Sequence, residues 1–298
     1  MKSIVITGGN SMIGRHLLRK MDKESNHVTA LVRKLPPETQ TIRGVTYIEL
    51  PMERYREIGE FINACDVFIP LAWAGSRREE LDNERKNRFS FETVRDTAVY
   101  LIEKRGCRKV ILPGSHHEYS RSGQPIDEMS DENPSLAYGA FRLKLYRTLC
   151  NYCERYDARC IELRLFSVYG EDAAEDKMIN RTLGKLTRDE SIVLKQGEQV
   201  YSFLYVDDAA DAFIKVLNAE PCPSGHYNVS SNCHMQLKEF VKQMKEIAGS
   251  RSNIIIGNEA EKVHTIILSG KMSDVFDWKP HVDFCTGVEK MLSYYRRG

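Results

Sequence analysis

The sequence lacks an excess of charge of either sign, since 43 Lys and Arg residues stand against 42 Asp and Glu residues in a chain of 298. This balance excludes a strongly basic domain wrapped on nucleic acid and an acidic tail protein. Long apolar runs are also missing: the longest uncharged apolar stretch, residues 67–76, falls short of the about 18 residues that a membrane span needs. Because residues 3–7 already follow a strand pattern, we expect no signal peptide and a soluble, cytoplasmic protein.

A complete set of metal ligands at the spacing of a zinc site is missing as well. The eight cysteines include one Cys-x-x-Cys pair, Cys150 and Cys153, but this pair lies inside a helical pattern. No second pair and no histidine follow it at the spacing of a zinc site. We therefore expect no metal site, and eight reduced thiols that serve mostly in packing.

Repeats, low-complexity segments and Pro/Gly/Ser linkers are absent, and what is present is a regular alternation of short apolar runs with longer helical patterns. The short runs are rich in β-branched residues and almost continuously apolar, which is typical of parallel strands buried on both faces. The alternation predicts an α/β fold with a doubly wound parallel sheet. The predicted strands are 3–7, 27–32, 46–49, 67–71, 109–113 and 161–166, and the predicted helices are 13–23, 52–63, 85–104 and 138–156.

A glycine-rich turn, Thr7-Gly8-Gly9-Asn10-Ser11-Met12-Ile13-Gly14, joins the first predicted strand to the first predicted helix. Gly8 allows a tight turn, and Gly14 lets the helix pack close to the sheet. Backbone N–H groups at the N-terminus of such a helix bind a pyrophosphate. The turn therefore predicts a dinucleotide site formed by Gly8, Asn10, Ser11, Met12, Ile13 and Gly14.

The second predicted strand is followed by two cations, Arg33 and Lys34, at the place where a site for NAD has a carboxylate that binds the ribose 2′-hydroxyl. The planar guanidinium of Arg33 can instead pair with the 2′-phosphate of NADP, and Arg15 could assist. This slightly favours NADP over NAD as the coenzyme. The alternative is that Arg33 and Lys34 belong to a solvated loop.

After Ser167 the predicted elements become shorter and turn residues become more frequent. Helical patterns cover residues 177–188, 208–217, 235–247 and 286–295. We expect residues 1–167 to form the dinucleotide-binding domain, to which the chain returns around residues 203–219. Residues 168–298 should form mainly a smaller α+β domain that binds substrate, because ligands bind where the carboxyl ends of the strands meet such a part.

Several ordered motifs resemble the extended short-chain dehydrogenase/reductases, the family of NAD-dependent epimerases and dehydratases that act on nucleotide sugars. The turn at residues 7–14 is similar to the family's TGGxGxIG, with Ser11 in place of a glycine. Further matches are residues 66–73 with D-V-V-I-H-L-A-A, 163–170 with L-R-x-x-N-V-Y-G, 203–212 with F-x-Y-V-D-D-V-A-x-A, and the strand 225–229 with G-x-x-Y-N-V. The resemblance implies a Rossmann fold that binds NAD(P), and a homodimer formed through two long helices of each subunit.

The resemblance also implies catalytic residues. Tyr138 falls at the position of the family's acid/base, and Ser115 falls at the position of the serine that binds the reacting oxygen. The family's Tyr-x-x-x-Lys is here Tyr-x-x-x-Arg, so Arg142 takes the place of the lysine that assists the tyrosine and holds the nicotinamide ribose. A guanidinium keeps the charge but cannot release a proton. The resemblance places Leu71, Ala72, Trp73, Tyr138 and Arg142 around the coenzyme.

The substrate-binding residues depart further from the family pattern. The arginine that often anchors the diphosphate is replaced by Tyr201, and none is found near residues 261–263, where a second is usual. Arg181 can supply that charge, and His116, beside His117, is expected to line the substrate pocket. The charged stretch 77–88 is mixed in sign and indicates a solvated loop and helix start rather than a lid.

Two functional hypotheses from different classes follow. The first is a nucleotide-sugar oxidoreductase that transfers hydride at the sugar 4-position, either as a 4-epimerase or as a 4-keto reductase. Arg33 and Lys34 favour the reductase, and the histidine pair at residues 116–117 disfavours a dehydratase, which has an Asp-Glu pair there. The second is a sensor or scaffold that binds NAD(P) with little or no catalysis, which Arg142 and the missing diphosphate arginines support.

Overall fold

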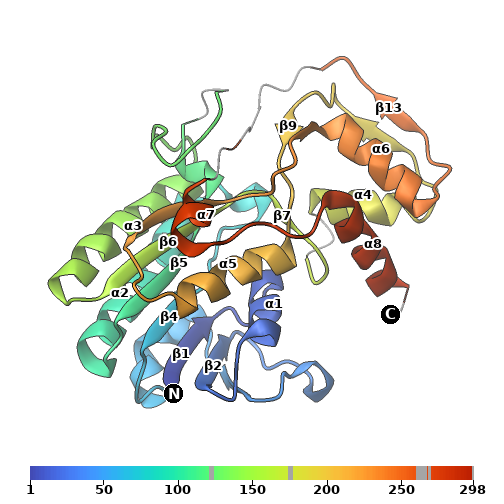
Figure 1. Ribbon diagram of the computed structural model, residues 1–298. Helices are drawn as coiled ribbons and strands as arrows, with labels where there is room; N and C mark the ends of the chain where they lie inside the picture. Colours follow the sequence, from blue (N-terminus) through green and yellow to red (C-terminus); the bar gives the residue numbers. More distant parts are fainter. Residues whose placement is uncertain (121–123, 174–176, 260–266, 268–269, 297–298) are drawn as a thin grey trace.

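The computed structural model describes residues 1–120, 124–173, 177–259, 267 and 270–296. Its centre is a seven-stranded sheet in which all paired strands are parallel, in the order β11-β6-β5-β4-β1-β2-β3 (Figure 1). The predicted doubly wound α/β fold is thereby confirmed. The strands are β1 Lys2–Thr7, β2 Asn26–Val32, β3 Val45–Glu49, β4 Val67–Pro70, β5 Lys109–Ser115, β6 Arg159–Leu165 and β11 Gly225–Val229.

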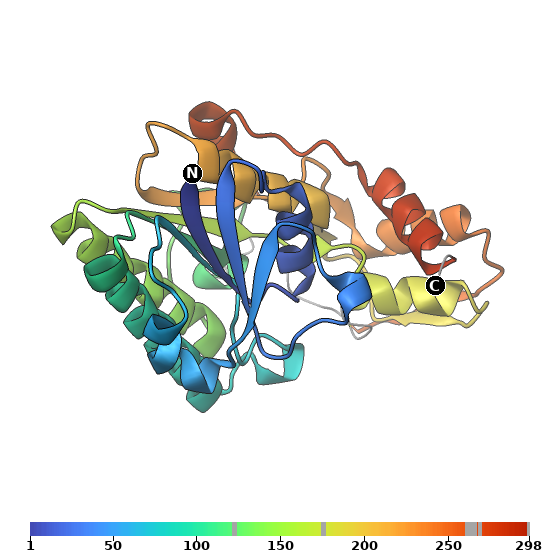
Figure 2. The same cartoon turned by 90° about the horizontal axis from the view of Figure 1, so that it is seen from below.

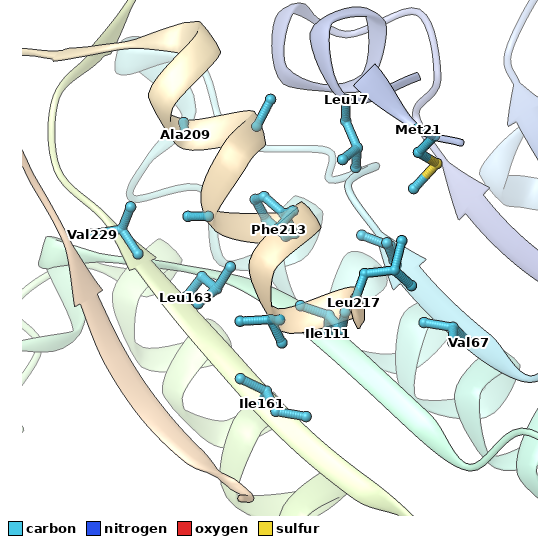
Figure 3. Close-up of a cluster of buried hydrophobic side chains, with 14 of the residues drawn as sticks. Leu17, Met21, Val67, Ile111, Ile161, Leu163, Ala209, Phe213, Leu217 and Val229 are labelled. Carbon is cyan, nitrogen blue, oxygen red and sulfur yellow. The ribbon is translucent and has the colours of Figure 1, made fainter. Parts of the chain in front are cut away.

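Helices cover both faces of this sheet. Successive side chains of a strand point to opposite faces, and here the apolar side chains on both faces have to be buried. On one face, Ile4 and Ile6 pack with helices α1 (Met12–Lys20) and α5 (Val206–Asn218). Figure 3 shows part of this cluster, with Phe213 of α5 and Leu17 of α1. On the other face, the intervening Val5 packs with α2 (Glu84–Arg105), α3 (Ala137–Arg155) and the 3₁₀ segment η2 (Met52–Glu60). Strand β11 and helix α5 come from beyond Ser167, so the C-terminal half completes this layered core.

The other C-terminal elements form a smaller lobe with its own apolar cluster around Phe203, Phe240 and Phe284. Figures 1 and 2 show this lobe on the opposite side of the sheet from α2 and α3. Its helices are α4 Met178–Leu186, α6 Leu237–Ala248 and α8 Phe284–Tyr295, while α7 (Lys271–Phe276) packs against β11. Three two-stranded ladders support it: β7 (Val168–Tyr169) with β10 (Leu204–Tyr205), β9 (Val200–Tyr201) with β12 (Met235–Gln236), and β8 (Ile192–Leu194) with β13 (Ile254–Ile256).

The carboxylate of Asp172 joins this lobe to the first helix of the sheet. Asp172, which follows β7, accepts hydrogen bonds from Arg15 Nη1 and Arg19 Nη2 of α1, each at 3.1 Å. The Tyr294 hydroxyl of α8 donates to the same carboxylate at 3.1 Å. The side chain of Asp172 is only 4% exposed, so α1 and α8 converge on one nearly buried charge.

Two helix predictions differ from the structure. Residues 52–60 form a 3₁₀ segment and not an α-helix, because its buried residues Tyr55 and Ile58 are three apart and the three-residue turn keeps them on one face. The helix predicted over 13–23 ends at Lys20, since the Asp22 carboxylate accepts the backbone N–H groups of Glu24 and Ser25 and starts a turn.

Among the described residues, no helix combines the length and apolar character needed to cross a membrane. Within the same ranges, no group of three or more His, Cys, Asp or Glu side chains is placed to hold a metal ion. All eight cysteines are free thiols, five of them buried in the core or between its elements: Cys65, Cys107, Cys153, Cys160 and Cys222.

Candidate active site

The predicted dinucleotide turn lies where the strand order of the sheet reverses, between β1 and β4. Open α/β sheets bind ligands in the crevice beyond the carboxyl ends of the strands at such a point. Gly8 has a φ of +72°, and a Cβ on it would lie 2.8 Å from the backbone nitrogen of Ala72. The Ala72 N–H also donates to Thr7 Oγ1 at 3.2 Å. The turn after β1 and the predicted coenzyme residues Leu71 and Ala72 after β4 are therefore in contact.

The turn keeps the form of a pyrophosphate site although Ser11 replaces a glycine. Ser11 is the N-cap of α1, and its Oγ accepts the N–H of Gly14 at 3.1 Å. A Cβ on Gly14 would lie 2.4 Å from the carbonyl oxygen of Gly8, so a larger residue could not pack there. The N–H groups of Met12 and Ile13 have no acceptor inside the helix and remain for an anion.

The two cations proposed to bind a 2′-phosphate, Arg33 and Arg15, have different surroundings. Arg33 is exposed, directly follows the last residue of β2, and forms no ion pair within the described ranges. The Asn10 amide donates to the carbonyl of Lys34 at 2.8 Å and so holds this segment beside the turn. Arg15 is committed elsewhere, because it donates to Asp172 and, through Nε, to the carbonyl of Asn10 at 3.2 Å. The cations that stay exposed at the end of β2 are Arg33 and its neighbour Lys34.

Tyr138 is the second residue of α3, and a loop preceding α2 fixes its backbone. The Tyr138 N–H donates to the carbonyl of Leu81 at 2.8 Å. The preceding N–H, of Ala137, donates to Asp82 Oδ1 at 3.2 Å. A carboxylate at the N-terminus of a helix is favoured by its free N–H groups and its dipole. Part of the charged stretch 77–88 thus docks on the first turn of α3, where a solvated loop was predicted.

The first turn of α3 also packs against η4 (His116–Glu118), the 3₁₀ turn that follows β5. A Cβ on Gly139 would lie 2.0 Å from the carbonyl oxygen of His117, so only glycine permits this approach. The ring of Tyr138 consequently meets the ring of His117 edge-on at 5.9 Å. His116 instead stacks on Phe166, with ring centroids 5.7 Å apart. Of the two histidines, His117 is the one whose ring meets Tyr138.

Arg142 lies one turn further along α3 and is only 5% exposed. Its Nη1 donates to the carbonyl of Pro113 at 2.7 Å. Its guanidinium carbon lies 4.0 Å from the ring centroid of Trp73 and 5.2 Å from that of Tyr138. Its Nε is buried without a hydrogen-bond partner. The predicted residues Trp73, Tyr138 and Arg142 therefore meet in one place, with a positive charge and an unused donor.

Ser115 ends β5 and caps η4. Its Oγ accepts the N–H of His117 at 3.3 Å, and its own N–H donates to Glu118 Oε1 at 2.6 Å, which completes a capping box. Because the Oγ serves as an acceptor within the cap, its proton remains available to a further oxygen. The cap fixes the direction of a hydroxyl that can donate.

A buried ionic cluster lies behind Ser115. Arg164, with a fully buried side chain, donates from Nε to Glu162 at 2.9 Å and approaches Glu118 at 3.4 Å and Glu132 through Nη2. Burial raises the pKa of Glu118, and burial together with the Glu118 carboxylate raises the pKa of Glu162 well above its usual range. Burial and the mutual repulsion of the two carboxylates therefore both favour the protonated form of this pair.

The remaining predicted substrate residues lie in or near the second lobe. Arg181 is an exposed residue of α4, and Tyr201 belongs to β9, where its ring stacks on Phe203 with centroids 5.2 Å apart. The segment 261–263, where a second arginine was sought, lies outside the described residues.

Four residues of this region were missed from the sequence: Leu81, Asp82, Asn87 and Glu118. Leu81 and Asp82 act on the start of α3 across more than fifty residues, and Asn87 accepts the indole N–H of Trp73, so no local pattern marks them. Glu118 does carry a signal, because Ser115-x-x-Glu118 is a capping-box sequence.

The comparisons with known proteins agree with this geometry. Residues 4–230 match the model of the NAD dependent epimerase/dehydratase family. The chain is 26% identical to a CDP-abequose synthase of Salmonella muenchen, with 98% of this chain and 97% of the other covered. It is 22% identical to a dTDP-4-dehydro-6-deoxyglucose reductase of Escherichia coli, with 98% and 97% covered.

Among solved structures, a UDP-N-acetylglucosamine 4-epimerase from Methanobrevibacter ruminantium, in complex with UDP-N-acetylmuramic acid, has the same fold. Its TM-score is 0.87 at 20% identity, with 99% of this chain and 98% of that chain covered. The family match spans well over half of the sequence and includes the turn after β1, Tyr138 and Arg142. The chain belongs to the NAD-dependent epimerase/dehydratase family.

Proposed function

We propose that this protein is an NAD(P)-dependent oxidoreductase that transfers hydride at the 4-position of a nucleotide-activated sugar. The contact between Arg142 and Tyr138 carries the proposal: a guanidinium lies 5.2 Å from the ring centroid of a tyrosine, and no described carboxylate pairs with it. An unbalanced positive charge stabilises the phenolate that tyrosine becomes when it gives its proton to a sugar oxygen. The names of the two relatives above refer to nucleotide-linked sugars, which supports this substrate class.

The residues present fit a dinucleotide. The N–H groups of Met12 and Ile13 would hold the pyrophosphate, with Gly8 and Gly14 leaving room for it. Arg142 would bind the nicotinamide ribose through its unpartnered Nε. When bound, the nicotinamide ring supplies or accepts the hydride.

Each protein side chain then has one task. Tyr138 exchanges the proton of the sugar 4-hydroxyl, and Ser115 donates a hydrogen bond to the same oxygen. Residues 168–298, apart from α5 and β11, form the substrate-binding part. There Arg181 and Tyr201 bind the nucleotide diphosphate, and His116 and His117 line the sugar pocket from the side of the sheet. The long helices α2 and α3 form a homodimer interface.

Of the two reaction types, 4-keto reduction with NADPH fits better than epimerisation. A reductase releases its coenzyme in every turnover, and Arg33 offers an exposed guanidinium to the 2′-phosphate that distinguishes NADPH. We expect Arg33→Asp to weaken NADPH binding about tenfold, which corresponds to about 1.4 kcal/mol, and to leave NADH binding unchanged. Titrations followed by nicotinamide fluorescence measure both constants. Equal losses for both coenzymes would exclude a contact with the 2′-phosphate.

The test of the function itself is coenzyme oxidation and product analysis by the purified chain. The panel contains UDP-, CDP- and dTDP-hexoses and their 4-keto-6-deoxy forms, each with NADH and with NADPH. Consumption of NADPH with a 4-keto sugar supports the reductase, and interconversion of two sugars without net coenzyme consumption supports the epimerase. Coenzyme binding without any change of sugar supports the second candidate, an NAD(P)-binding sensor, which the arginine at position 142 favours.

A further inference from the structure

Trp73 and Arg142 form the closest cation–aromatic contact in the described part of the chain. The guanidinium carbon of Arg142 lies 4.0 Å from the indole centroid, against 5.2 Å for the Tyr138 ring. The indole and phenol rings are perpendicular, with centroids 6.3 Å apart. Arginine stacks well on an indole face, and a buried contact of this kind contributes more than an exposed one.

The indole is itself held in one orientation. Its Nε1–H donates to Asn87 Oδ1 at 2.8 Å in a buried site. The Asn87 amide nitrogen faces three backbone carbonyls, of Glu80, Leu81 and Asn83, at 3.3, 3.4 and 2.9 Å. Three acceptors on the nitrogen side fix the orientation of the amide, so its oxygen must face the indole.

The same loop holds the tyrosine. The Leu81 carbonyl that Asn87 approaches also accepts the N–H of Tyr138 at 2.8 Å. The indole, through Asn87, and the start of α3, through Leu81, therefore share one rigid support. This loop holds Trp73 and Tyr138, but it makes no hydrogen bond to the side chain of Arg142 among the described residues.

Arg142 has few other anchors. One hydrogen bond, from Nη1 to the carbonyl of Pro113, is all that the structure gives it, and its Nε has no acceptor. A flexible side chain with one anchor rotates unless a surface limits it, and the face of Trp73 is that surface. The orphaned Nε marks the direction in which a ligand acceptor belongs, since a buried donor without a partner is costly.

We propose that Trp73 is a positioning residue, whose indole face holds the Arg142 guanidinium so that Nε is presented to the coenzyme. This inference rests on the proposed function, because it requires a bound NAD(P). In this proposal Trp73 affects coenzyme binding by holding Arg142, whereas the sequence suggested that Trp73 contacts the coenzyme directly.

A double-mutant cycle tests the dependence of one residue on the other, with the affinity for NADH and NADPH as the readout. Trp73→Met keeps the volume but removes the aromatic face, and should weaken the better-bound coenzyme about tenfold, a loss of about 1.4 kcal/mol. Arg142→Met should weaken it by at least as much. The double variant should bind as Arg142→Met does, to within about twofold.

Two variants act as controls. Trp73→Phe retains a face and should stay within about threefold of the unmodified chain. Phe91→Leu truncates another aromatic of the same apolar cluster, one that contacts Arg95 and Lys144 outside the site, and should leave coenzyme affinity unchanged. A purely structural role of Trp73 would make Phe91→Leu as harmful as Trp73→Met.

A second measurement remains if Trp73→Met does not fold. The chain has two tryptophans, Trp73 and Trp278, so in a Trp278→Phe background all indole emission comes from Trp73. Introducing Arg142→Met there should change the intensity of that emission, and unchanged emission would show that the contact is absent.

The outcomes separate the two proposals. If the unmodified chain binds neither NADH nor NADPH at millimolar concentration, the proposed function fails. If it binds one of them but the two single losses add in the double variant, or Trp73→Met has no effect, only the role of Trp73 is overturned.

Discussion

The protein has two buried arginines at the carboxyl ends of its central strands, and their surroundings are opposite. Arg164 is enclosed by Glu118, Glu132 and Glu162, so its charge is more than balanced. Arg142 faces two aromatic rings and one carbonyl, and no described carboxylate lies within ion-pair distance of it, although its charge acts to lower the pKa of Glu118. Burying a charge without an ion-pair partner is expensive, so a fold that does so leaves a field that a ligand can use. We propose that the paired arginine supports the fold and that the arginine without an ion-pair partner takes part in the reaction.

Exchanging each arginine for methionine should produce the largest contrast. Arg164→Met leaves carboxylates buried without their partner, and we expect it to lower the free energy of unfolding by about 3–5 kcal/mol. Arg142→Met removes a charge that has no ion partner, so its cost should stay below about 2 kcal/mol. Urea denaturation at pH 7 measures both. Equal losses would show that the two sites do not differ in kind.

The next effect concerns the tyrosine beside the unbalanced charge. Tyr138→Phe removes the proton donor while keeping the ring, and should lower turnover by about 10²–10⁴-fold with coenzyme affinity retained. Tyr152→Phe alters a tyrosine of the same helix that binds Glu103 at the surface, and should leave turnover unchanged. Single-turnover hydride transfer is the measurement. Retained transfer in Tyr138→Phe would remove this residue from the mechanism.

Glu118 stands between the two regions, since it approaches Arg164 and also accepts the Ser115 N–H. Glu118→Gln keeps an acceptor for that N–H, and turnover should stay within about threefold, whereas Glu118→Ala should lower it about tenfold. Glu162→Ala removes an equally buried carboxyl of the same cluster that does not touch Ser115, and provides the comparison for stability. A turnover loss that is the same in Glu118→Ala and Glu162→Ala would show that the cap is not what matters.

The smallest effect is a dependence on pH. The pKa of Glu162 is raised in the folded chain by burial and by Glu118, so the folded state binds this proton more tightly than the unfolded state. Its contribution is therefore fully present below the unfolded pKa, about 4.5, and declines as pH rises through the folded value. Glu162→Gln imitates the protonated form. Its melting temperature, relative to that of the unmodified chain, should rise with increasing pH between 6 and 9, by a few degrees at most. A difference that is constant with pH would mean that Glu162 is ionised throughout.

The fold was predictable because its strands are buried on both faces, and that condition leaves a direct record in the sequence as β-branched runs such as residues 3–7. The 3₁₀ geometry of η2 was not predictable from the sequence. Whether this segment forms three-residue or four-residue turns depends on how Tyr55 and Ile58 pack against α2, and that packing is a property of the tertiary structure.

The site divides in the same way. Tyr138, Ser115 and Arg142 lie in ordered motifs and were all named from them, and the structure brings Tyr138 and Arg142 into contact. What the motifs do not contain is the support. Leu81 and Asp82 act on the start of α3 across more than fifty residues, and Asn87 orients Trp73. These roles depend on a loop whose charged composition suggested only solvent. Arg15 shows the reverse error, since its position near the turn suggested a phosphate contact, and the distant Asp172 binds it.

The carboxylate of Asp172 has a mechanical consequence. Helix α1 carries the dinucleotide turn at one end, and α8 belongs to the smaller lobe, so Asp172 links the two. A second carboxylate, Asp207, lies between His16 of α1 and Lys290 of α8. A displacement of the lobe away from α1 would therefore have to break both of these charged contacts.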